Sequence, residues 1–169
     1  MNLYTSAFET PLGPFSFAVD EDGALVASTF GKPSRLSLPA GSHNLEPDEK
    51  RTRAARDQLT AYFSGKLQKF SLALSPRGTP FQNRVWAQLS KIPFGSTRSY
   101  GNIATALKSS PRAVGGAVGS NPYCPVIPCH RIIGSDGSLT GFAFGLDAKI
   151  WLLKHEGIPC GETSEKTMF

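Results

Sequence analysis

The chain is 169 residues long, with a net charge of +5, 40% hydrophobic residues and 18% charged residues. This is an ordinary globular balance, long enough for one large domain or two small ones. No apolar run approaches the roughly 18 residues of a membrane span, and the first residues lack the regions of a signal peptide. We therefore expect a soluble protein of the cytoplasm, or of the nucleus in a eukaryote.

The cysteine content argues against a disulfide-stabilised or zinc-binding protein. There are three cysteines, Cys124, Cys129 and Cys160. A small odd number does not build a disulfide framework and fits a reducing compartment, where a thiol stays free. No CxxC pair with a matching His or Cys pair is present, so we expect no metal site.

The first third of the chain predicts strands followed by a helix. Apolar runs at 15–19 and 24–30 are joined by Asp20-Glu21-Asp22-Gly23, a hairpin signal, so residues 1–30 are predicted to form strands. Residues 31–48 hold few apolar residues and predict a loop. Apolar spacing predicts a helix over Glu49–Phe63. The Ser-Pro-Arg-Gly sequence at 75–78 places a domain boundary there, which gives domains 1–77 and 78–169.

The second part predicts a series of helices. Thr79-Pro80 is a helix start, with Thr favoured at the N-cap and Pro at the first helical position. Apolar residues then recur at helical spacing to Ile92, and Pro93 ends that helix. A short helix over 100–107 and another over 112–118, with Ser110 as N-cap, surround a tight turn. Two such helices predict a helix-turn-helix.

The remaining segments surround Cys129. Val126-Ile127 and Ile132-Ile133 are predicted to be buried extended segments, and Ser135-Asp136-Gly137 a turn. The last helix is predicted over 146–156, stopped by Gly157. Residues 158–169 are predicted to be a loose tail.

Basic residues dominate the stretch between Asp57 and Asp136, which contains no carboxylate. Its nine basic residues are Lys66, Lys69, Arg77, Arg84, Lys91, Arg98, Lys108, Arg112 and Arg131. A stretch of one sign attracts a polyanion such as nucleic acid. A solvated basic face without a partner is the equal alternative on charge alone.

Two adjacent glycines interrupt the second short helix. Gly115 and Gly116 cost that helix about 1 kcal/mol each relative to Ala. A sequence that accepts this cost needs a close approach of the backbone to something. Tight packing on another helix and close contact with nucleic acid both qualify, and the acid-free stretch favours the second.

Cys129 is a candidate nucleophile because His130 follows it. A thiolate is the reactive form, and a nearby imidazole lowers the thiol pKa. Adjacent residues diverge in a strand or a helix, however, so direct contact between these two requires a special turn or a water between them. From these two residues alone, a small buried cysteine is the preferred interpretation.

A wider set of motifs changes that balance. Pro128-Cys129-His130-Arg131-Ile132-Ile133 resembles the active-site signature of the O6-alkylguanine-DNA alkyltransferases, also called methylated-DNA–protein-cysteine methyltransferases. Residues 78–157 carry further similar motifs in the same order, and residues 1–77 resemble the family more weakly, chiefly at Thr10-Pro11-Leu12-Gly13. The further motifs are Gly78-Thr79-Pro80-Phe81-Gln82, Arg84-Val85-Trp86, Ser99-Tyr100-Gly101, Arg112-Ala113-Val114-Gly115-Gly116-Ala117, Asn121-Pro122, Gly145-Leu146, Trp151-Leu152-Leu153 and His155-Glu156-Gly157.

The resemblance implies an α+β protein: a small ribonuclease H-like α/β domain followed by a mainly helical domain with the helix-turn-helix. It implies DNA repair by a single irreversible transfer of the alkyl group from O6-alkylguanine to Cys129, without cofactor or metal. The partner implied is double-stranded DNA, bound by a monomer in the minor groove. The target base is flipped out of the stack.

The resemblance also implies roles for individual residues. Cys129 is the acceptor, His130 its base through a water, Glu156 the group that holds His130, and Asn121 a brace for the turn. Tyr100 donates a proton toward guanine N3. The carbonyls of Cys129 and Ile132 and the N–H of Ala143 bind the base, in a pocket that also includes Pro128 and Phe144. Arg112 fills the gap left by the flipped nucleotide, in a DNA surface with Ser99, Ala113, Gly115 and Gly116.

Several positions depart from the family pattern. The link at Lys108-Ser109-Ser110-Pro111 is two residues shorter than usual, Phe142 replaces a common Tyr, and Phe144 stands where many relatives have Gly. We expect Phe144 to narrow the pocket for the O6 substituent.

Three other functions remain open. An alkyltransferase-like protein binds damage without repairing it, but lacks the acceptor cysteine that is present here. A cysteine hydrolase using Cys129, His130 and Glu156 would turn over. A helix-turn-helix regulator would bind undamaged DNA with sequence specificity.

Overall fold

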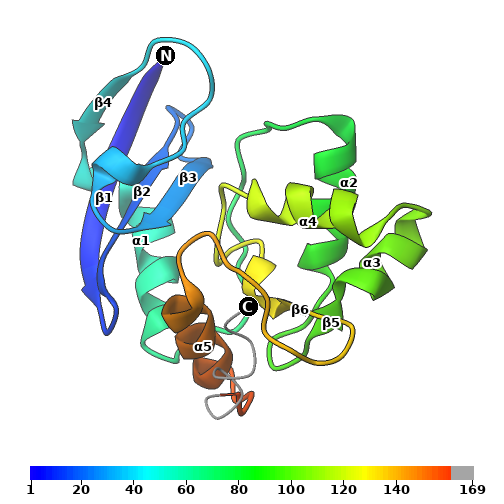
Figure 1. Cartoon of the computed structure of the whole chain (residues 1–169). Helices are drawn as coiled ribbons and strands as arrows, with labels where there is room; N and C mark the ends of the chain where they lie inside the picture. Colours follow the sequence, from blue (N-terminus) through cyan, green and yellow to red (C-terminus); the bar gives the residue numbers. More distant parts are fainter. Residues whose placement is uncertain (161–169) are drawn as a thin grey trace. The chain divides into compact units, whose positions relative to one another are not determined.

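The computed structural model describes residues 1–160. The chain divides into two compact units, one spanning Met1–Arg77 and one beginning at Gly78 (Figure 1). The first is a mixed α/β unit and the second is mainly helical. Among the described residues, no helix combines the length and the apolar character needed to cross a membrane.

The first unit is a four-stranded sheet with one long helix. The sheet order is β3-β2-β1-β4, with β1 antiparallel to β2, β2 antiparallel to β3, and β4 parallel to β1. Helix α1 contacts β1 and β2. The elements are β1 (Asn2–Thr10), β2 (Gly13–Val19), β3 (Leu25–Phe30), the 3-10 turn η1 (Pro33–Arg35), β4 (Asn44–Pro47) and α1 (Glu49–Phe63).

An aromatic cluster joins the sheet to α1. The Phe15 ring from β2 lies 5.0 Å from that of Phe63 on α1 and 5.2 Å from that of Phe30 on β3, measured between ring centroids. Phe8 of β1 completes the cluster, with its centroid 5.9 Å from that of Phe63. Such rings supply large buried apolar area and prefer tilted or edge-on contacts. The strands predicted within residues 1–30 and the helix predicted over 49–63 are confirmed. The aromatic packing holds these elements together.

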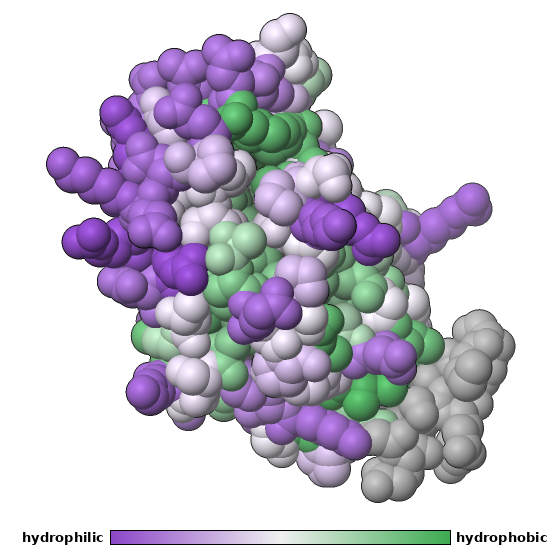
Figure 2. Space-filling model, turned by 90° about the vertical axis from the view of Figure 1, so that its left-hand side faces the viewer, coloured by the Kyte–Doolittle hydropathy of each residue, from purple (hydrophilic) through white to green (hydrophobic). Residues whose placement is uncertain are grey.

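The loop predicted over residues 31–48 is wrong at its end, because β4 lies there. All four β4 residues are exposed, so the sequence shows no apolar alternation that would have revealed a strand. Their main-chain groups pair with β1, from Asn2↔Asn44 to Thr5↔Pro47. Figure 2 views the molecule from the β1 and β4 side, and hydrophilic side chains dominate the surface there.

The second unit surrounds a small parallel two-stranded sheet with helices. β5 pairs with β6, and α4 contacts both α2 and α3. The elements are α2 (Pro80–Ser90), β5 (Arg98–Ser99), α3 (Tyr100–Leu107), α4 (Pro111–Gly119), the 3-10 turn η2 (Cys129–Arg131), β6 (Ile132–Ile133) and α5 (Leu146–His155).

Side-chain caps set where these helices begin. Thr79 and Gln82 form a capping box at the start of α2, and Ser99 and Asn102 form one at the start of α3. The Ser110 side chain accepts from the N–H of Ala113, which confirms it as the N-cap of α4. Each cap satisfies N–H groups that have no partner within the helix.

The structure corrects three other predictions. Helix α2 ends at Ser90 rather than at residue 92. Residues 126–127 lie in turns rather than in an extended segment. The predicted loose tail is wrong over 158–160, because Cys160 is buried with Leu139 and Leu153. The remainder of that tail, residues 161–169, lies outside the described residues.

Helices α2 and α4 are joined by a buried hydrogen bond. The indole N–H of Trp86 donates to the carbonyl of Ala117 at 2.9 Å. Trp86 is 4% exposed and its ring lies edge-on to Tyr123. This bond fixes the helix that carries Gly115 and Gly116 against the core of the second unit.

We predict that Trp86→Phe lowers the free energy of unfolding by about 0.5–1.5 kcal/mol, because one buried hydrogen bond is lost while the Ala117 carbonyl still accepts from the Ser120 hydroxyl at 2.9 Å. Denaturant unfolding followed by circular dichroism measures the change. Trp151→Phe is the matched control, since Trp151 is only partly buried on α5. Equal effects of the two substitutions would contradict a special role for the Trp86 bond.

Candidate active site

Cys129 begins the short turn η2, and Asn121 shapes the segment that leads to it. The Asn121 side chain donates to the carbonyl of Ile127 at 2.8 Å and accepts from the N–H of Tyr123 at 3.0 Å. Two main-chain bonds, Ile127 N–H to Tyr123 and Cys129 N–H to Ile127, tighten the same loop. The buried amide therefore holds the backbone that presents Cys129.

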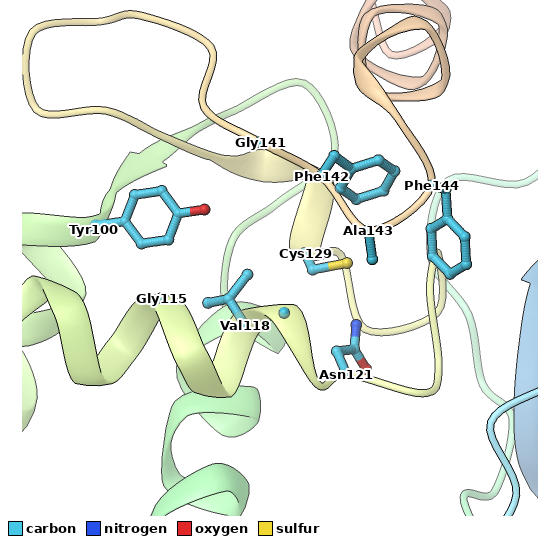
Figure 3. A pocket seen from close by; sticks show the side chains of 10 residues that line it. Tyr100, Gly115, Val118, Asn121, Cys129, Gly141, Phe142, Ala143 and Phe144 are labelled. Atoms are coloured by element: carbon cyan, nitrogen blue, oxygen red, sulfur yellow. The ribbon is translucent and has the colours of Figure 1, made fainter. Parts of the chain in front are cut away.

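Cys129 lines a cavity of about 260 Å³. In Figure 3 the sulfur lies between the Tyr100 ring on one side and Ala143 and Phe144 on the other. We call this space the Cys129 cavity. Its lining residues are Tyr100, Gly115, Val118, Gly119, Asn121, Cys129, Gly141, Phe142, Ala143 and Phe144.

Tyr100 enters the cavity from the first turn of α3. Its hydroxyl oxygen accepts a hydrogen bond from Thr140 Oγ1 at 3.2 Å, which leaves the phenolic proton free for another acceptor. Burial is the main cause that raises the pKa of Tyr100, and the nearby Cys129 adds to it. The phenol therefore stays protonated and can donate at neutral pH.

Glu156, the C-cap of α5, binds two neighbouring side chains of η2. The Nε2–H of His130 donates to Glu156 Oε2 at 2.7 Å. Arg131 donates from Nε to Oε1 at 2.7 Å and from Nη2 to Oε2 at 2.9 Å. Arg131 also donates to the carbonyl of Ile92 at 2.6 Å. His130, Arg131 and Glu156 are 0%, 6% and 4% exposed as whole residues.

The interaction with Glu156 determines which His130 nitrogen is basic. Because Nε2 carries the proton that Glu156 accepts, Nδ1 holds the lone pair of the neutral ring. That atom is buried and has no hydrogen-bond partner among the described residues. Burial, the main cause, lowers the pKa of His130. The imidazole is therefore neutral at neutral pH and available as a base.

The surroundings of Cys129 favour its thiolate. A hydrogen bond from the Cys124 thiol is the largest cause that lowers the pKa of Cys129, followed by a hydrogen bond from Asn121 and the charge of Lys149. Burial opposes these effects, and the net pKa lies below the usual value for a cysteine. A cysteine with a lowered pKa ionises more readily, so Cys129 is better suited to act as a nucleophile than an ordinary buried cysteine is.

Lys149 is a buried cation within α5. Its Nζ donates to the carbonyl of Ile132 at 2.6 Å and to that of Thr140 at 3.4 Å. Burial lowers the pKa of Lys149 to about 8, while Cys129 acts to raise it. At neutral pH the lysine therefore remains largely charged, next to the segment that contains Cys129.

The structure brings most of the predicted site residues together. Cys129, Tyr100, Asn121, Ala143 and Phe144 line the cavity, and His130 and Glu156 form one hydrogen-bonded pair. Pro128 and Ile132 are buried and do not line it. Within residues 1–160, no group of His, Cys, Asp and Glu side chains is arranged to hold a metal ion.

The predicted DNA surface lies mainly on α4. Arg112 and Ala113 are exposed in its first turn, and Gly116 is exposed in its middle. A Cβ built on Gly116 would meet nothing within 4 Å, whereas one on Gly115 would touch the Tyr100 ring at 3.8 Å. Helix packing therefore does not account for Gly116. Ser99 caps α3 and is partly buried.

The structure corrects the interpretation of one basic residue and adds three residues to the surroundings of Cys129. Arg131 belongs to the acid-free stretch, yet it is buried and paired with Glu156, so it does not contribute to a basic surface. The sequence motifs did not identify Lys149, Cys124 and Thr140 as residues of the site. Lys149 carried a signal in the sequence: it stands on the apolar face of its helix, three residues from Leu146 and from Leu152.

Two domain families match almost the whole described chain. Residues 3–76 match the family described as "6-O-methylguanine DNA methyltransferase, ribonuclease-like domain", and residues 80–158 match "6-O-methylguanine DNA methyltransferase, DNA binding domain". The chain belongs to the 6-O-methylguanine DNA methyltransferase family.

Relatives in this family are similar over nearly their full length. A methylated-DNA–protein-cysteine methyltransferase of Methanosarcina acetivorans is 43% identical over 92% of this chain and 99% of its own. One from Salmonella typhimurium is 39% identical, covering 93% and 97%. Among solved structures, Mycobacterium tuberculosis OGT in complex with DNA has a TM-score of 0.81 at 38% identity, covering 91% of this chain and 93% of that one.

We predict that Lys149→Met raises the pKa of Cys129, because the thiolate loses a nearby positive charge. The thiolate fraction at neutral pH should fall roughly three- to tenfold. Since Lys149 has a pKa of about 8, its contribution is present below that pH and is lost as the pH rises through it. Thiolate ultraviolet absorbance against pH, with Cys129→Ser as baseline, measures the effect.

The matched control for this lysine is Lys154→Met, which removes an exposed lysine of the same helix. It should leave the titration of Cys129 unchanged. A Lys149→Met protein whose Cys129 titrates like that of the unmodified chain would show that the lysine serves packing alone.

Proposed function

We propose that this protein repairs DNA by moving an alkyl group from O6 of guanine to the sulfur of Cys129, once per molecule. The observation that carries the proposal is a thiol with a lowered pKa that lines a cavity and is followed in the chain by a buried neutral histidine bonded to Glu156. Family membership supports it, because the relatives carry the name of this enzyme.

The proposed chemistry begins with removal of the thiol proton. His130 Nδ1 takes that proton through a bound water, and Glu156 stabilises the imidazolium that forms. The sulfur then attacks the alkyl carbon, a carbon–sulfur bond forms, and the carbon–oxygen bond to guanine breaks. The product is a thioether, which water does not readily cleave, so no second turnover follows and no metal or cofactor is needed.

The leaving guanine requires a proton and positioned donors. Tyr100 is proposed to donate its phenolic proton toward guanine N3, since burial keeps the phenol protonated. The N–H of Ala143 is proposed to donate to O6, and the carbonyls of Cys129 and Ile132 to accept from the amino group. The Ile132 carbonyl already accepts from Lys149 at 2.6 Å, which leaves it one lone pair for the base.

The proposed DNA contact is a helix-turn-helix formed by α3 and α4, with α4 in the minor groove. That groove is only about 6 Å wide, so a helix needs small residues on the side that enters it. Gly116 is exposed, and no atom within 4 Å of an added Cβ requires a glycine at that position. Gly115 and Ala113 lie near it on α4. We further propose Ser99 and Arg112 as contacts, with Arg112 filling the space left by the flipped base.

We propose that the protein acts as a monomer on double-stranded DNA carrying O6-alkylguanine, in the cytoplasm or, in a eukaryote, the nucleus. Among the described residues, Cys124, Cys129 and Cys160 form no disulfide bond, which suits a reducing compartment.

The direct test is intact-protein mass spectrometry after incubation with duplex DNA containing O6-methylguanine. We predict that one methyl group replaces one hydrogen per chain, on Cys129, and that Cys129→Ala still binds DNA but gains no mass. Binding without any mass gain in the unmodified chain would favour a damage-binding protein. More than one product per chain would favour a hydrolase.

Arg112 should matter for the duplex and not for the chemistry. We predict that Arg112→Ala slows repair of duplex DNA by roughly tenfold or more, because the flipped state loses its support. The rate with free O6-methylguanine should change little. Single-turnover rates on both substrates decide this, and equal losses on both would assign Arg112 another role.

Phe144 limits the substituents that the Cys129 cavity accepts. The side chain lines the cavity beside Ala143, with its ring 5.4 Å from that of Phe142 (Figure 3). A Phe side chain covers on the order of 150 Å² or more, and a glycine there would leave this space open. The cavity then fits a methyl group better than a benzyl group.

We predict that the protein repairs O6-methylguanine quickly but reacts slowly with O6-benzylguanine, and that Phe144→Gly raises the benzyl rate. The methyl rate should change less. Single-turnover rates for both substrates in both proteins measure this. A fast benzyl reaction in the unmodified chain, unaltered by Phe144→Gly, would show that the ring does not limit the cavity.

A further inference from the structure

The hydroxyl of Tyr100 is held by the loop that follows β6. Thr140 Oγ1 donates to the Tyr100 oxygen at 3.2 Å, and both residues are partly buried. In Figure 3 the Tyr100 hydroxyl points into the Cys129 cavity, toward the side where the sulfur lies. Because this oxygen accepts from Thr140, its own proton is directed elsewhere and is available to a base in the cavity.

The main chain at Thr140 is anchored independently of the phenol. Lys149, which is fully buried, donates from Nζ to the carbonyl of Ile132 at 2.6 Å and to that of Thr140 at 3.4 Å. One ammonium group therefore ties the loop to β6. Near the start of the same loop, the Asp136 carboxylate accepts from the N–H and the hydroxyl of Ser138 at 3.0 and 2.6 Å. The loop thus presents the Thr140 hydroxyl from a fixed backbone.

The ring of Tyr100 is held by helices as well. A Cβ added to Gly115 would lie 3.8 and 4.0 Å from two ring carbons, so the backbone of α4 runs close to the ring. Tyr100 itself lies in the first turn of α3, which begins at the capping box of Ser99 and Asn102. These contacts place the ring, while Thr140 contacts the oxygen that carries the proton.

The proposed reaction leaves a charge on that oxygen. When the Cys129 thiolate attacks the alkyl carbon, its negative charge passes to the leaving guanine as the carbon–oxygen bond breaks. The O–H bond of Tyr100 then breaks as its proton moves to guanine N3, which leaves neutral guanine and a phenolate. The charge that began on sulfur thus ends on the Tyr100 oxygen, in a partly buried position where an ion without a partner is costly.

We propose that Thr140 is a positioning residue for the transfer reaction, whose hydroxyl directs the Tyr100 proton toward the base and stabilises the phenolate that remains. The proposal rests on the proposed function, in which Tyr100 protonates guanine. At 3.2 Å the bond is longer than the usual distance of about 2.7–2.8 Å between hydroxyls. A bond to an ionised oxygen is shorter and roughly twice as strong. The contact therefore stabilises the transition state more than the resting protein, as catalysis requires.

The surroundings of Tyr100 oppose the formation of the phenolate. Burial raises the pKa of Tyr100, the hydrogen bond from Thr140 lowers it, and the charge of Cys129 raises it. Once the sulfur has become a thioether, its charge is gone and this last effect disappears. The Thr140 bond then acts against burial alone, at the stage when the proton is transferred.

The test is a double-mutant cycle that combines Thr140→Val with Tyr100→Phe. Val keeps the branched shape and removes the hydroxyl, whereas Thr140→Ser keeps a hydroxyl. Single-turnover rates with saturating duplex that contains O6-methylguanine are measured for each variant, together with its unfolding midpoint. Thr60→Val is the matched control, because Thr60 is also partly buried and its hydroxyl donates within α1, to the carbonyl of Arg56 at 2.8 Å.

We expect Thr140→Val to slow methyl transfer roughly tenfold when Tyr100 is present, because a bond to a developing charge is lost. In the Tyr100→Phe background the same change should slow transfer less than about twofold, since the hydroxyl has no phenol to act on. Thr140→Ser should keep most of the rate, and Thr60→Val all of it. A packing defect would slow both backgrounds by one factor, so equal factors would overturn the proposal.

A titration without DNA gives a second readout. Carbon NMR of protein labelled in its tyrosine rings follows the ionisation of Tyr100, with Tyr100→Phe to assign the signal. Thr140→Val should raise the pKa of Tyr100, and Thr140→Ser should leave it near that of the unmodified chain. An unchanged pKa in the folded Thr140→Val protein would show that the hydroxyl does not act on the phenol.

The outcomes separate this inference from the proposed function. An unmodified chain that transfers no methyl group would refute the proposed function, and this inference with it. Transfer by the unmodified chain with equal factors in the cycle would refute the role of Thr140 alone. If Thr140→Val does not fold, Thr140→Ala takes its place in the cycle and in the titration, with Thr140→Ser again as the variant that keeps the hydroxyl.

Discussion

The site depends on one buried carboxylate, that of Glu156. It accepts from His130 on one oxygen and from Arg131 on both, and it joins the end of α5 to the turn η2 that begins with Cys129. Arg131 extends this link to the carbonyl of Ile92, after α2. Removing the carboxylate would leave Arg131 as a buried unpaired charge, at a cost of about 3–5 kcal/mol. Glu156 therefore both stabilises the fold, through Arg131, and positions the base His130.

The reactive state of Cys129 is a balance of opposing effects. Burial favours the neutral thiol, while the donors Cys124 and Asn121 and the charge of Lys149 favour the thiolate, and the donors prevail. Burial of His130 acts in the useful direction, because it keeps the imidazole neutral and able to take a proton. Burial thus opposes ionisation of the Cys129 thiol but keeps His130 in the neutral form that accepts a proton. Several groups around the sulfur are therefore needed to stabilise the thiolate.

Local signals predicted the elements and the motif, but not the contacts between distant segments. Thr79 and Ser110 marked helix starts because their side chains act within three residues, and the strands that pack Phe15 followed from apolar patterning. Strand β4 was not predicted because it pairs with β1 through its main chain and all four of its residues are exposed. Charge counting placed Arg131 on the surface because nothing local reveals that Glu156, 25 positions away, buries it.

The central claim is that Glu156 holds His130 as a neutral ring with the proton on Nε2 and the lone pair on Nδ1. Nitrogen NMR of the labelled protein measures this directly, since the two ring nitrogens have distinct shifts when protonated and unprotonated. The account predicts a protonated Nε2 and an unprotonated Nδ1 for His130 at neutral pH. A proton on Nδ1, or a doubly protonated ring under these conditions, would contradict it.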